Sequence, residues 1–165
     1  MVLDISKLIN NDGASINISS EIVMDSLLFN GQDICFNSPL HLKGDIRSVN
    51  GLMYLQLSCS VSYKTRCSRC LDPVDEELDF NIKEVFSKTE LENENDDVII
   101  LNSNEIDLKE IAEQAFCCAL PITCLCSEDC KGLCSSCGCN LNTETCSCET
   151  DDIDPRLAAL KDFLK

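Results

Sequence analysis

The stretch MYLQLSCSVSYKTRC, residues 53–67, decides the fold, because apolar or small side chains alternate with mostly polar ones along its whole length. Such a period of two predicts a long strand with one buried face and one face in water. Asn50-Gly51 directly before it supplies the two positive φ angles of a tight hairpin turn. Residues 40–49 alternate in the same way, so the two segments are predicted to form an antiparallel hairpin.

The alternation continues on the C-terminal side of this stretch. After a turn near Leu71-Asp72-Pro73, five apolar residues share the even-numbered face of a third strand: Val74, Leu78, Phe80, Ile82 and Phe86. Three consecutive strands predict an antiparallel meander, a sheet type that can leave one face exposed to water. Short strands or turns are expected in residues 1–37, a solvated, mobile acidic loop in 87–97, and a return to the sheet at 98–101.

Two helices are expected. Asp107 and Glu110 form a capping-box-like start for a helix over 107–120, which ends before Pro121. Asp154-Pro155 begins a short C-terminal helix. The predicted fold class is therefore α+β: an antiparallel β-sheet meander with one packed helix and a small Cys-rich zinc-knuckle lobe that ends in a C-terminal helix. We expect residues 1–121 to form the sheet with its helix and 122–165 the zinc-binding lobe, together one compact unit.

The composition restricts the cellular setting. The chain has 165 residues, a formal net charge of −16, one histidine and 14 cysteines. No window holds the roughly 18 consecutive apolar residues of a membrane helix, and the start lacks the features of a secretory signal, so a cytoplasmic protein without membrane contact is expected. Thiols stay reduced in that compartment, which makes metal ligation a better use of many cysteines than disulfides.

The cysteines concentrate near the C-terminus, where Cys134-Ser135-Ser136-Cys137-Gly138 has the spacing of a zinc knuckle. Because structural zinc takes four ligands, a second pair is needed, and one zinc ion is expected per chain. The candidate ligands are Cys134, Cys137, Cys146, Cys148 and, as a competitor for one position, Cys130. The extra thiols Cys124, Cys126 and Cys139 receive no role, although eight thiols between 124 and 148 would be enough for two ions. Buried packing thiols, an iron–sulfur cluster and a thiol-redox sensor stay open as alternatives.

A second Cys-x-x-Cys, Cys67 to Cys70, ends the best strand. A single motif of this kind is weak support for a site, so three interpretations stay open. It can be a hairpin corner with packed thiols, which we favour slightly, half of a metal site completed from the C-terminal set, or a redox pair.

Positive charge collects in residues 41–70, although the whole chain is acidic. On a hairpin these cations can form one strip suited to RNA phosphates: Lys43, Arg47, Lys64, Arg66 and Arg69. An equally good interpretation is a solvated strand face whose cations pair with acids of the third strand.

An enzyme is not expected. His41 is the single imidazole, and the sequence contains no glycine-rich phosphate loop, no nucleophile elbow and no histidine cluster. We therefore expect no catalytic residues and no small-molecule substrate.

Several short motifs in order resemble the YceD family of large ribosomal RNA subunit accumulation proteins. They are Cys67-x-Arg69-Cys70-Leu71, Ile106-Asp107-Leu108 before Leu120-Pro121, CKGLCSSCG at 130–138, Asn140-Leu141-Asn142, Cys146-x-Cys148 and Ile153-Asp154-Pro155-Arg156-Leu157. The resemblance implies a cytosolic bacterial protein that is not an enzyme and that supports accumulation or processing of 23S ribosomal RNA. Its expected partner is the large-subunit ribosomal RNA precursor or a basic large-subunit ribosomal protein. The alternative function is a zinc-thiol redox-sensing switch.

Overall fold

A long antiparallel meander organises the structure, as the alternation predicts. The computed structural model describes residues 1–9, 11–89 and 98–148. Strand β5 (Leu40–Val49) turns into β6 (Leu52–Arg66), which is followed by β7 (Pro73–Ser87), and each pairs antiparallel with the next. Asn50 and Gly51 have φ angles of 52° and 79°, so the predicted hairpin turn is confirmed.

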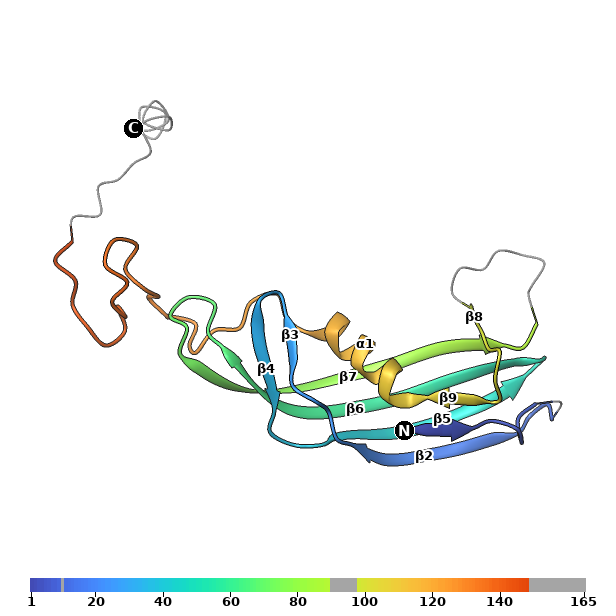
Figure 1. Cartoon of the computed structure of the whole chain (residues 1–165). Helices are drawn as coiled ribbons and strands as arrows, with labels where there is room; N and C mark the ends of the chain where they lie inside the picture. Colours follow the sequence, from blue (N-terminus) through green and yellow to red (C-terminus); the bar gives the residue numbers. More distant parts are fainter. Residues whose placement is uncertain (10, 90–97, 149–165) are drawn as a thin grey trace, which may run out of the picture.

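Further strands extend this meander into a seven-stranded sheet (Figure 1). On one side β2 (Ser15–Ile22) pairs with β5. Beyond the end of β5, β4 (Gln32–Phe36) pairs with β6. The short strand β3 (Leu27–Phe29) pairs in turn with β4. On the other side β8 (Val98–Ile100) joins the end of β7 in a parallel direction. The predicted return to the sheet is confirmed, while β2 is longer than the short strands expected there.

One helix covers the sheet. Helix α1 (Leu108–Ala119) begins after Asp107, whose carboxylate accepts a hydrogen bond from the Lys109 backbone N–H at 2.9 Å, so the predicted cap is confirmed. A two-stranded ribbon of β1 (Val2–Asp4) and β9 (Glu105–Asp107) leads into the helix. Among the described residues, no helix is both long and apolar enough to cross a membrane.

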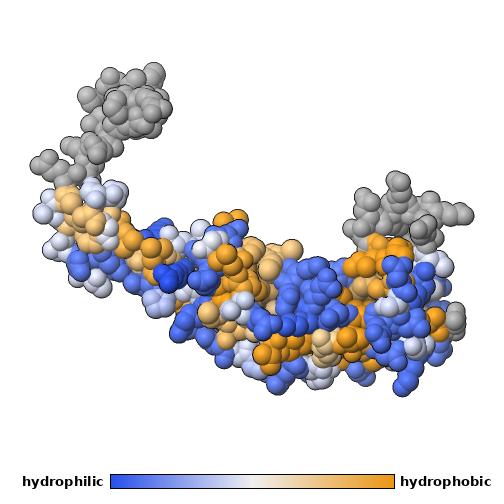
Figure 2. Space-filling view, in the orientation of Figure 1, coloured by the Kyte–Doolittle hydropathy of each residue, from blue (hydrophilic) through white to orange (hydrophobic). Residues whose placement is uncertain are grey.

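The core lies between α1 and the sheet. Phe116 is fully buried, and its ring packs against Phe36, Tyr63 and Phe80 at centroid distances of 5.0, 5.5 and 6.1 Å. The opposite face of the sheet has no helix over it among the described residues (Figure 1). The visible surface is a mosaic of hydrophilic areas and separate hydrophobic patches (Figure 2).

Strands β5 and β6 approach closely at Gly44. A Cβ atom at this position would lie 1.9 Å from the backbone oxygen of Gln56, far inside contact distance. Only glycine is therefore compatible with the strand spacing here.

The Cys-rich segment follows α1 and extends from the end of the sheet where β6 turns into β7 (Figure 1). Its residues up to 148 form turns and one isolated bridge, between Leu133 and Asn140. The α+β class and the Cys-rich lobe are confirmed in this coarse form. The predicted C-terminal helix and most of the predicted acidic loop lie outside the described residues.

Candidate metal centres

Eight cysteines gather into two groups of four at the end of the sheet and in the adjoining lobe. Within each group all four Sγ atoms lie within 4.8 Å of one another. The first centre consists of Cys67, Cys70, Cys126 and Cys130, and the second of Cys134, Cys137, Cys139 and Cys146.

The sulfur separations suit a tetrahedral ion. In the first centre, Sγ of Cys67 lies 3.7 Å from Sγ of Cys130, and Cys70 lies 3.5 Å from Cys126. Four thiolates around zinc at Zn–S distances near 2.3 Å are separated by about 3.8 Å, whereas a disulfide needs a separation of about 2.05 Å. The distances therefore match ligation and not covalent pairing.

The second centre has similar distances. Sγ of Cys146 lies 3.3 Å from Sγ of Cys134 and 3.5 Å from Sγ of Cys137. The backbone N–H of Cys134 donates to the carbonyl of Cys139 at 2.9 Å, and this hydrogen bond keeps Cys139 next to the Cys134–Cys137 turn. Both centres can hold a metal ion.

The two Cys-x-x-Cys turns have the same backbone form. The N–H of Leu71 donates to the carbonyl of Cys67 at 3.0 Å, and the N–H of Gly138 donates to the carbonyl of Cys134 at 2.9 Å. Leu71 and Gly138, each directly after the second cysteine, have φ angles of 63° and 75°. Glycine adopts this left-handed region freely and leucine does not. The first turn is thus a knuckle whose glycine position is occupied by leucine.

Backbone N–H groups point at the first cysteine of each turn. Burial raises the pKa of the Cys67 thiol, but donors led by the N–H groups of Cys70 and Cys126 lower it to about 6. Donation from the N–H groups of Cys137 and Ser136 lowers the pKa of Cys134 to about 6. Both turns therefore favour the thiolate form, which is the form that binds metal.

The first centre attaches the lobe to the sheet. Cys67 follows β6 directly, and Cys130 belongs to the lobe, yet both are buried. The guanidinium of Arg69 donates from Nη1 to the carbonyls of Cys130 at 2.9 Å and Glu128 at 3.4 Å. The N–H of Leu133 donates to the carbonyl of Arg69 at 3.1 Å. Arg69 therefore holds the loop that supplies two of the four ligands.

Two asparagines connect the second turn to the first centre. Asn142 donates from Nδ2 to Sγ of Cys130 at 3.3 Å, and its Oδ1 accepts from the N–H of Lys131 at 2.8 Å. Asn140 donates from Nδ2 to the carboxylate of Asp72 at 2.8 Å. Hydrogen bonds of this kind orient metal ligands and tune their basicity.

The second centre is more open than the first. Cys134 is buried, Cys139 and Cys146 are half-buried, and Cys137 is exposed. A fifth thiol lies beside it: hydrogen bonding with the sulfurs of Cys146 and Cys137 raises the pKa of Cys148 to about 12. This centre has one more thiol than a tetrahedral ion uses.

Both centres fall within a stretch that matches a known family. The family model described as "Large ribosomal RNA subunit accumulation protein YceD" matches residues 55–164, about two thirds of the chain. The chain belongs to the YceD family. The resemblance inferred from the short motifs is confirmed.

The relatives of this YceD-family chain are uncharacterized proteins. A protein of Mycobacterium leprae is 29% identical over 171 residues, which cover 99% of this chain and 77% of that protein. The protein YlbN of Bacillus subtilis is 28% identical over 155 residues, 92% of this chain and 89% of YlbN. A protein of Mycobacterium tuberculosis H37Rv is 35% identical over 102 residues, 59% of this chain and about half (49%) of that protein. No solved structure matches the chain.

The structure distributes the predicted YceD-family metal ligands over both centres. Three of them, Cys134, Cys137 and Cys146, meet in the second centre, where the fourth position belongs to Cys139; Cys148 is their neighbour. The structure places Cys130 in the first centre, with the pair Cys67 and Cys70 and with Cys126. One four-cysteine site drawn from the C-terminal set alone thus gives way to two sites, because the lobe folds back onto the Cys67 turn.

Cys126 and Cys139 are the candidate ligands that sequence reasoning missed. Cys126 lies four residues before Cys130, and Cys139 directly follows the glycine of the second knuckle. The count of eight thiols in residues 124–148 was the available signal, but no spacing rule assigns each of them to a centre.

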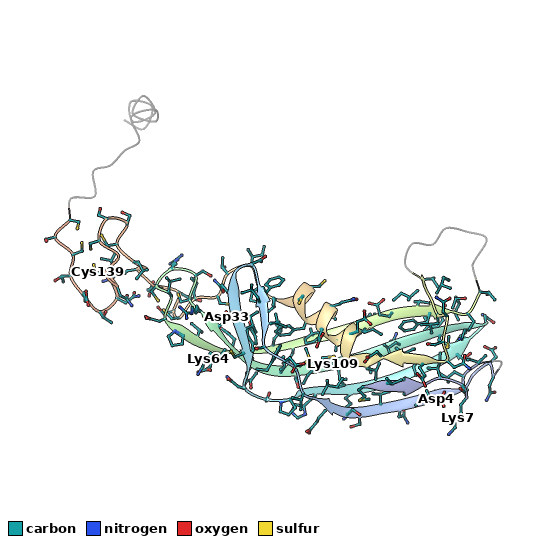
Figure 3. The ribbon with its side chains drawn as sticks, viewed as in Figure 1. Asp4, Lys7, Asp33, Lys64, Lys109 and Cys139 are labelled. Atoms are coloured by element: carbon teal, nitrogen blue, oxygen red, sulfur yellow. The ribbon has the colours of Figure 1, made fainter. Side chains whose placement is uncertain are left out.

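The predicted cationic strip is spread along the exposed face of the sheet in the structure. Lys43, Arg47, Lys64 and Arg66 are exposed residues of the sheet, but Arg47 lies opposite Tyr54, twelve positions along β6 from Arg66. At about 3.3 Å per residue this is a span of roughly 40 Å. Lys64 lies at the end of the sheet nearest the lobe that contains Cys139 (Figure 3).

Three of the five predicted cations have partners. Arg47 forms an ion pair with Asp45, and Nζ of Lys64 lies 3.6 Å from a carboxylate oxygen of Asp75 on β7. Arg69 is engaged with carbonyls of the lobe. The alternative interpretation, a strand face whose cations pair with acids, describes the Lys64–Asp75 contact.

Proposed function

We propose that this chain is a non-enzymatic factor that supports the accumulation or processing of 23S ribosomal RNA by binding a component of the large ribosomal subunit. The family description, which names large ribosomal RNA subunit accumulation, supports the process. The sequence has one imidazole and neither a glycine-rich phosphate loop nor a nucleophile elbow, which favours a binding role. His41 lies on the exposed sheet face, with Nδ1 3.3 Å from a carboxylate oxygen of Glu21.

Zinc is the metal that the two centres suit best. Four thiolates at tetrahedral spacing are typical of structural zinc, which stabilises small lobes that lack a sizeable apolar core. The packing around the first centre is small: Val74, Leu125 and Leu133 pack against the buried sulfurs. Zinc would therefore replace apolar packing at the junction of lobe and sheet.

A basic ribosomal protein is the partner we favour over RNA. The observation that carries this choice is that Arg47, Lys64 and Arg69, three of the five cations of the strip, already have partners within the chain. Sequence-independent RNA binding relies on a continuous row of free cations. A net charge of −16 repels RNA and attracts a basic protein.

The process is tested by depleting the protein in growing cells and measuring the ratio of 23S to 16S ribosomal RNA, with precursor ends mapped. We expect a selective fall in 23S that is reversed by the wild-type chain. A normal ratio in well-depleted cells would refute the proposal.

Partner class is tested by affinity purification from the same cells. A basic ribosomal protein is expected to co-purify, to be lost at high salt and to persist after nuclease treatment. Loss on nuclease treatment would identify RNA as the partner instead.

The open second centre favours one further candidate function, a zinc-thiol switch. Exposed Cys137 and the surplus thiol Cys148 would allow hydrogen peroxide to oxidise two thiolates to a disulfide with release of the ion and formation of water. Zinc release by mild peroxide that is abolished by Cys148→Ser would support this function. Retention of zinc under that treatment would exclude it.

A further inference from the structure

The β7 edge of the sheet is open along most of its length. β7 pairs with β6 over all of residues 73–87, whereas β8 pairs only with residues 85–87. In an antiparallel pair, every second residue directs its N–H and C=O away from the partner strand. Among the described residues, no further strand or loop forms backbone hydrogen bonds with residues 73–84. This segment is called the open edge below.

The chain itself shows that this edge accepts a strand. Val98–Ile100 add to it as β8 in a parallel direction, with Val85 opposite Val98 and Ser87 opposite Ile100. The open edge continues directly from this pairing. An extended peptide would prolong an existing ladder, which is how many sheets bind peptides.

A groove runs beside the open edge on its helix side. It has a volume of about 690 Å³ and lies between β7 and α1. Its apolar lining comes from Phe80 and Ile82 of the strand and Ile111, Ala115 and Ala119 of the helix. Alternate side chains of an added strand would point into this groove, and its apolar lining favours apolar side chains there, although Glu84 and Gln114 also line it.

The other face beside the open edge is acidic over residues 75–79, whereas Lys83 lies further along it. Asp75, Glu77 and Asp79 are exposed on it. Asp75 lies near Lys64, but Glu77 and Asp79 lie opposite Ser62 and Ser60 of β6, which supply no positive charge. The remaining side chains of an added strand would lie beside these carboxylates, so the edge favours lysine or arginine there.

We propose that the open edge of β7 binds an extended segment of a basic partner protein as an additional strand, with apolar side chains in the α1 groove and alternate basic side chains beside Glu77 and Asp79. The inference rests on the proposed partner class, a basic protein, and identifies its docking surface. Backbone pairing supplies affinity in this mode, and the alternation of side chains supplies specificity.

The probe is a fluorescein-labelled nine-residue peptide in which five lysines alternate with four valines. Its binding to the full-length, metal-loaded chain is measured by fluorescence anisotropy. The matched control is a block isomer with five lysines followed by four valines, which has equal charge but cannot separate the two faces. We expect the block isomer to bind about tenfold more weakly, and N-methylation of alternate residues to remove binding of the alternating peptide.

Substitutions then locate the site. Glu77→Lys and Asp79→Lys are each expected to weaken the alternating peptide by several-fold, and together by about tenfold. Ala115→Glu places a charge in the groove and is expected to weaken binding as well. The matched control is Glu21→Lys on β2 at the far edge of the sheet, which should leave binding unchanged. Circular dichroism checks that each variant keeps the fold.

Four results would overturn the inference. Equal binding of both peptides, or no loss in Glu77→Lys, would reduce it to unspecific charge attraction. A dimer in sedimentation that Asp79→Lys disrupts would assign the edge to a second copy of the chain. Peptide binding only after removal of residues 149–165 would assign it to the chain's own C-terminal segment. The peptide assay uses purified protein, whereas the depletion experiment uses growing cells. Peptide binding can therefore be absent although depletion lowers 23S, and peptide binding can occur although depletion leaves 23S unchanged.

Discussion

Asn142 donates a hydrogen bond from Nδ2 to Sγ of Cys130 at 3.3 Å, so a residue between two ligands of the second centre supports a ligand of the first. The same side chain donates to Oδ1 of Asn140 at 2.9 Å, and Asn140 donates to Asp72 beside the first turn. The two centres are therefore joined through side chains as well as through the backbone.

Asn142→Ala is expected to lower the metal affinity of the first centre by about 10- to 100-fold, because the Cys130 thiolate loses a donor that orients it. Competition with a chromophoric chelator measures the affinity. The control is Thr145→Ala, an exposed residue of the same loop, which should keep the wild-type affinity. Equal affinities in the two variants would show that the Asn142 contact does not support the site.

Each centre is expected to bind one ion, which gives two ions per chain. Cys126→Ser and the double change Cys139→Ser with Cys148→Ser should each lower the content from two to one, because the first leaves three thiols in the first centre and the second removes both a ligand and the surplus thiol of the other. Cys118→Ser, an exposed helix residue outside both centres, should leave it at two. Metal analysis of protein purified under reducing conditions checks the counts, and a single ion in the wild-type chain would contradict the two-centre arrangement.

Leu71→Gly is expected to change the free energy of unfolding by less than about 0.5 kcal/mol, because relief of the left-handed conformation offsets the backbone entropy of glycine. Leu71→Val should cost about 1 kcal/mol or more, since a β-branched side chain tolerates a φ of 63° less well. Urea unfolding of metal-loaded protein measures both. If Leu71→Gly lowers the free energy of unfolding more than Leu71→Val does, the packing of the exposed Leu71 side chain outweighs the strain of its backbone.

Phe116→Ala is expected to destabilise the sheet and helix by about 3–5 kcal/mol, because it leaves a cavity among three other aromatic rings. The control is Gln114→Ala on the exposed side of α1, which should change stability by less than about 0.5 kcal/mol. Thermal unfolding compares the two. Similar melting temperatures would mean that the ring cluster can collapse around the missing side chain.

Asp25, in the segment before β3, forms an ion pair with Lys109 of α1. The distance between Nζ of Lys109 and the carboxylate of Asp25 is 2.6 Å. Its hydrogen bond and charge attraction with Lys109 lower the pKa of Asp25 below its ordinary 3.8. A carboxyl whose pKa is lower in the folded state stabilises the fold above its unfolded value and loses this contribution as the pH falls through the folded value.

Asp25→Asn should therefore weaken the decline of stability below about pH 3.8 and change the slope little at neutral pH. Denaturant unfolding from pH 2 to 7 measures the effect. Exposed Asp33, for which no ion pair occurs among the described residues, is the matched control as Asp33→Asn. Parallel pH curves for Asp25→Asn and wild type would contradict the assignment.

The parts of the fold that sequence predicts well depend on neighbours along the chain. The buried face of β6, the Asn50-Gly51 turn and the start of α1 each follow from residues within a few positions of one another. The parallel pairing of β8 was not predicted, because a three-residue apolar run carries no sign of which edge it joins.

The candidate site was predicted only in part for the same reason. The Cys134–Cys137 knuckle is visible from its own spacing and its glycine, whereas Leu71 in the glycine position obscures the Cys67–Cys70 knuckle. Arg69 counts as a free cation in the sequence, and only the folded lobe brings carbonyls to its guanidinium. Grouping eight thiols by centre requires the path of the backbone.

The two centres differ in the length of chain that each must close. Cys67 and Cys130 are 63 residues apart, whereas Cys134 and Cys146 are separated by 12. Closing the longer loop costs roughly 1.5 kcal/mol more in chain entropy, and folding of the segments within it compensates for this cost. During synthesis all four cysteines of the first centre precede those of the second, but they meet only when β7 and α1 have folded between them. Metal loading of the first centre thus reports a completed sheet, whereas loading of the second requires only its own short loop.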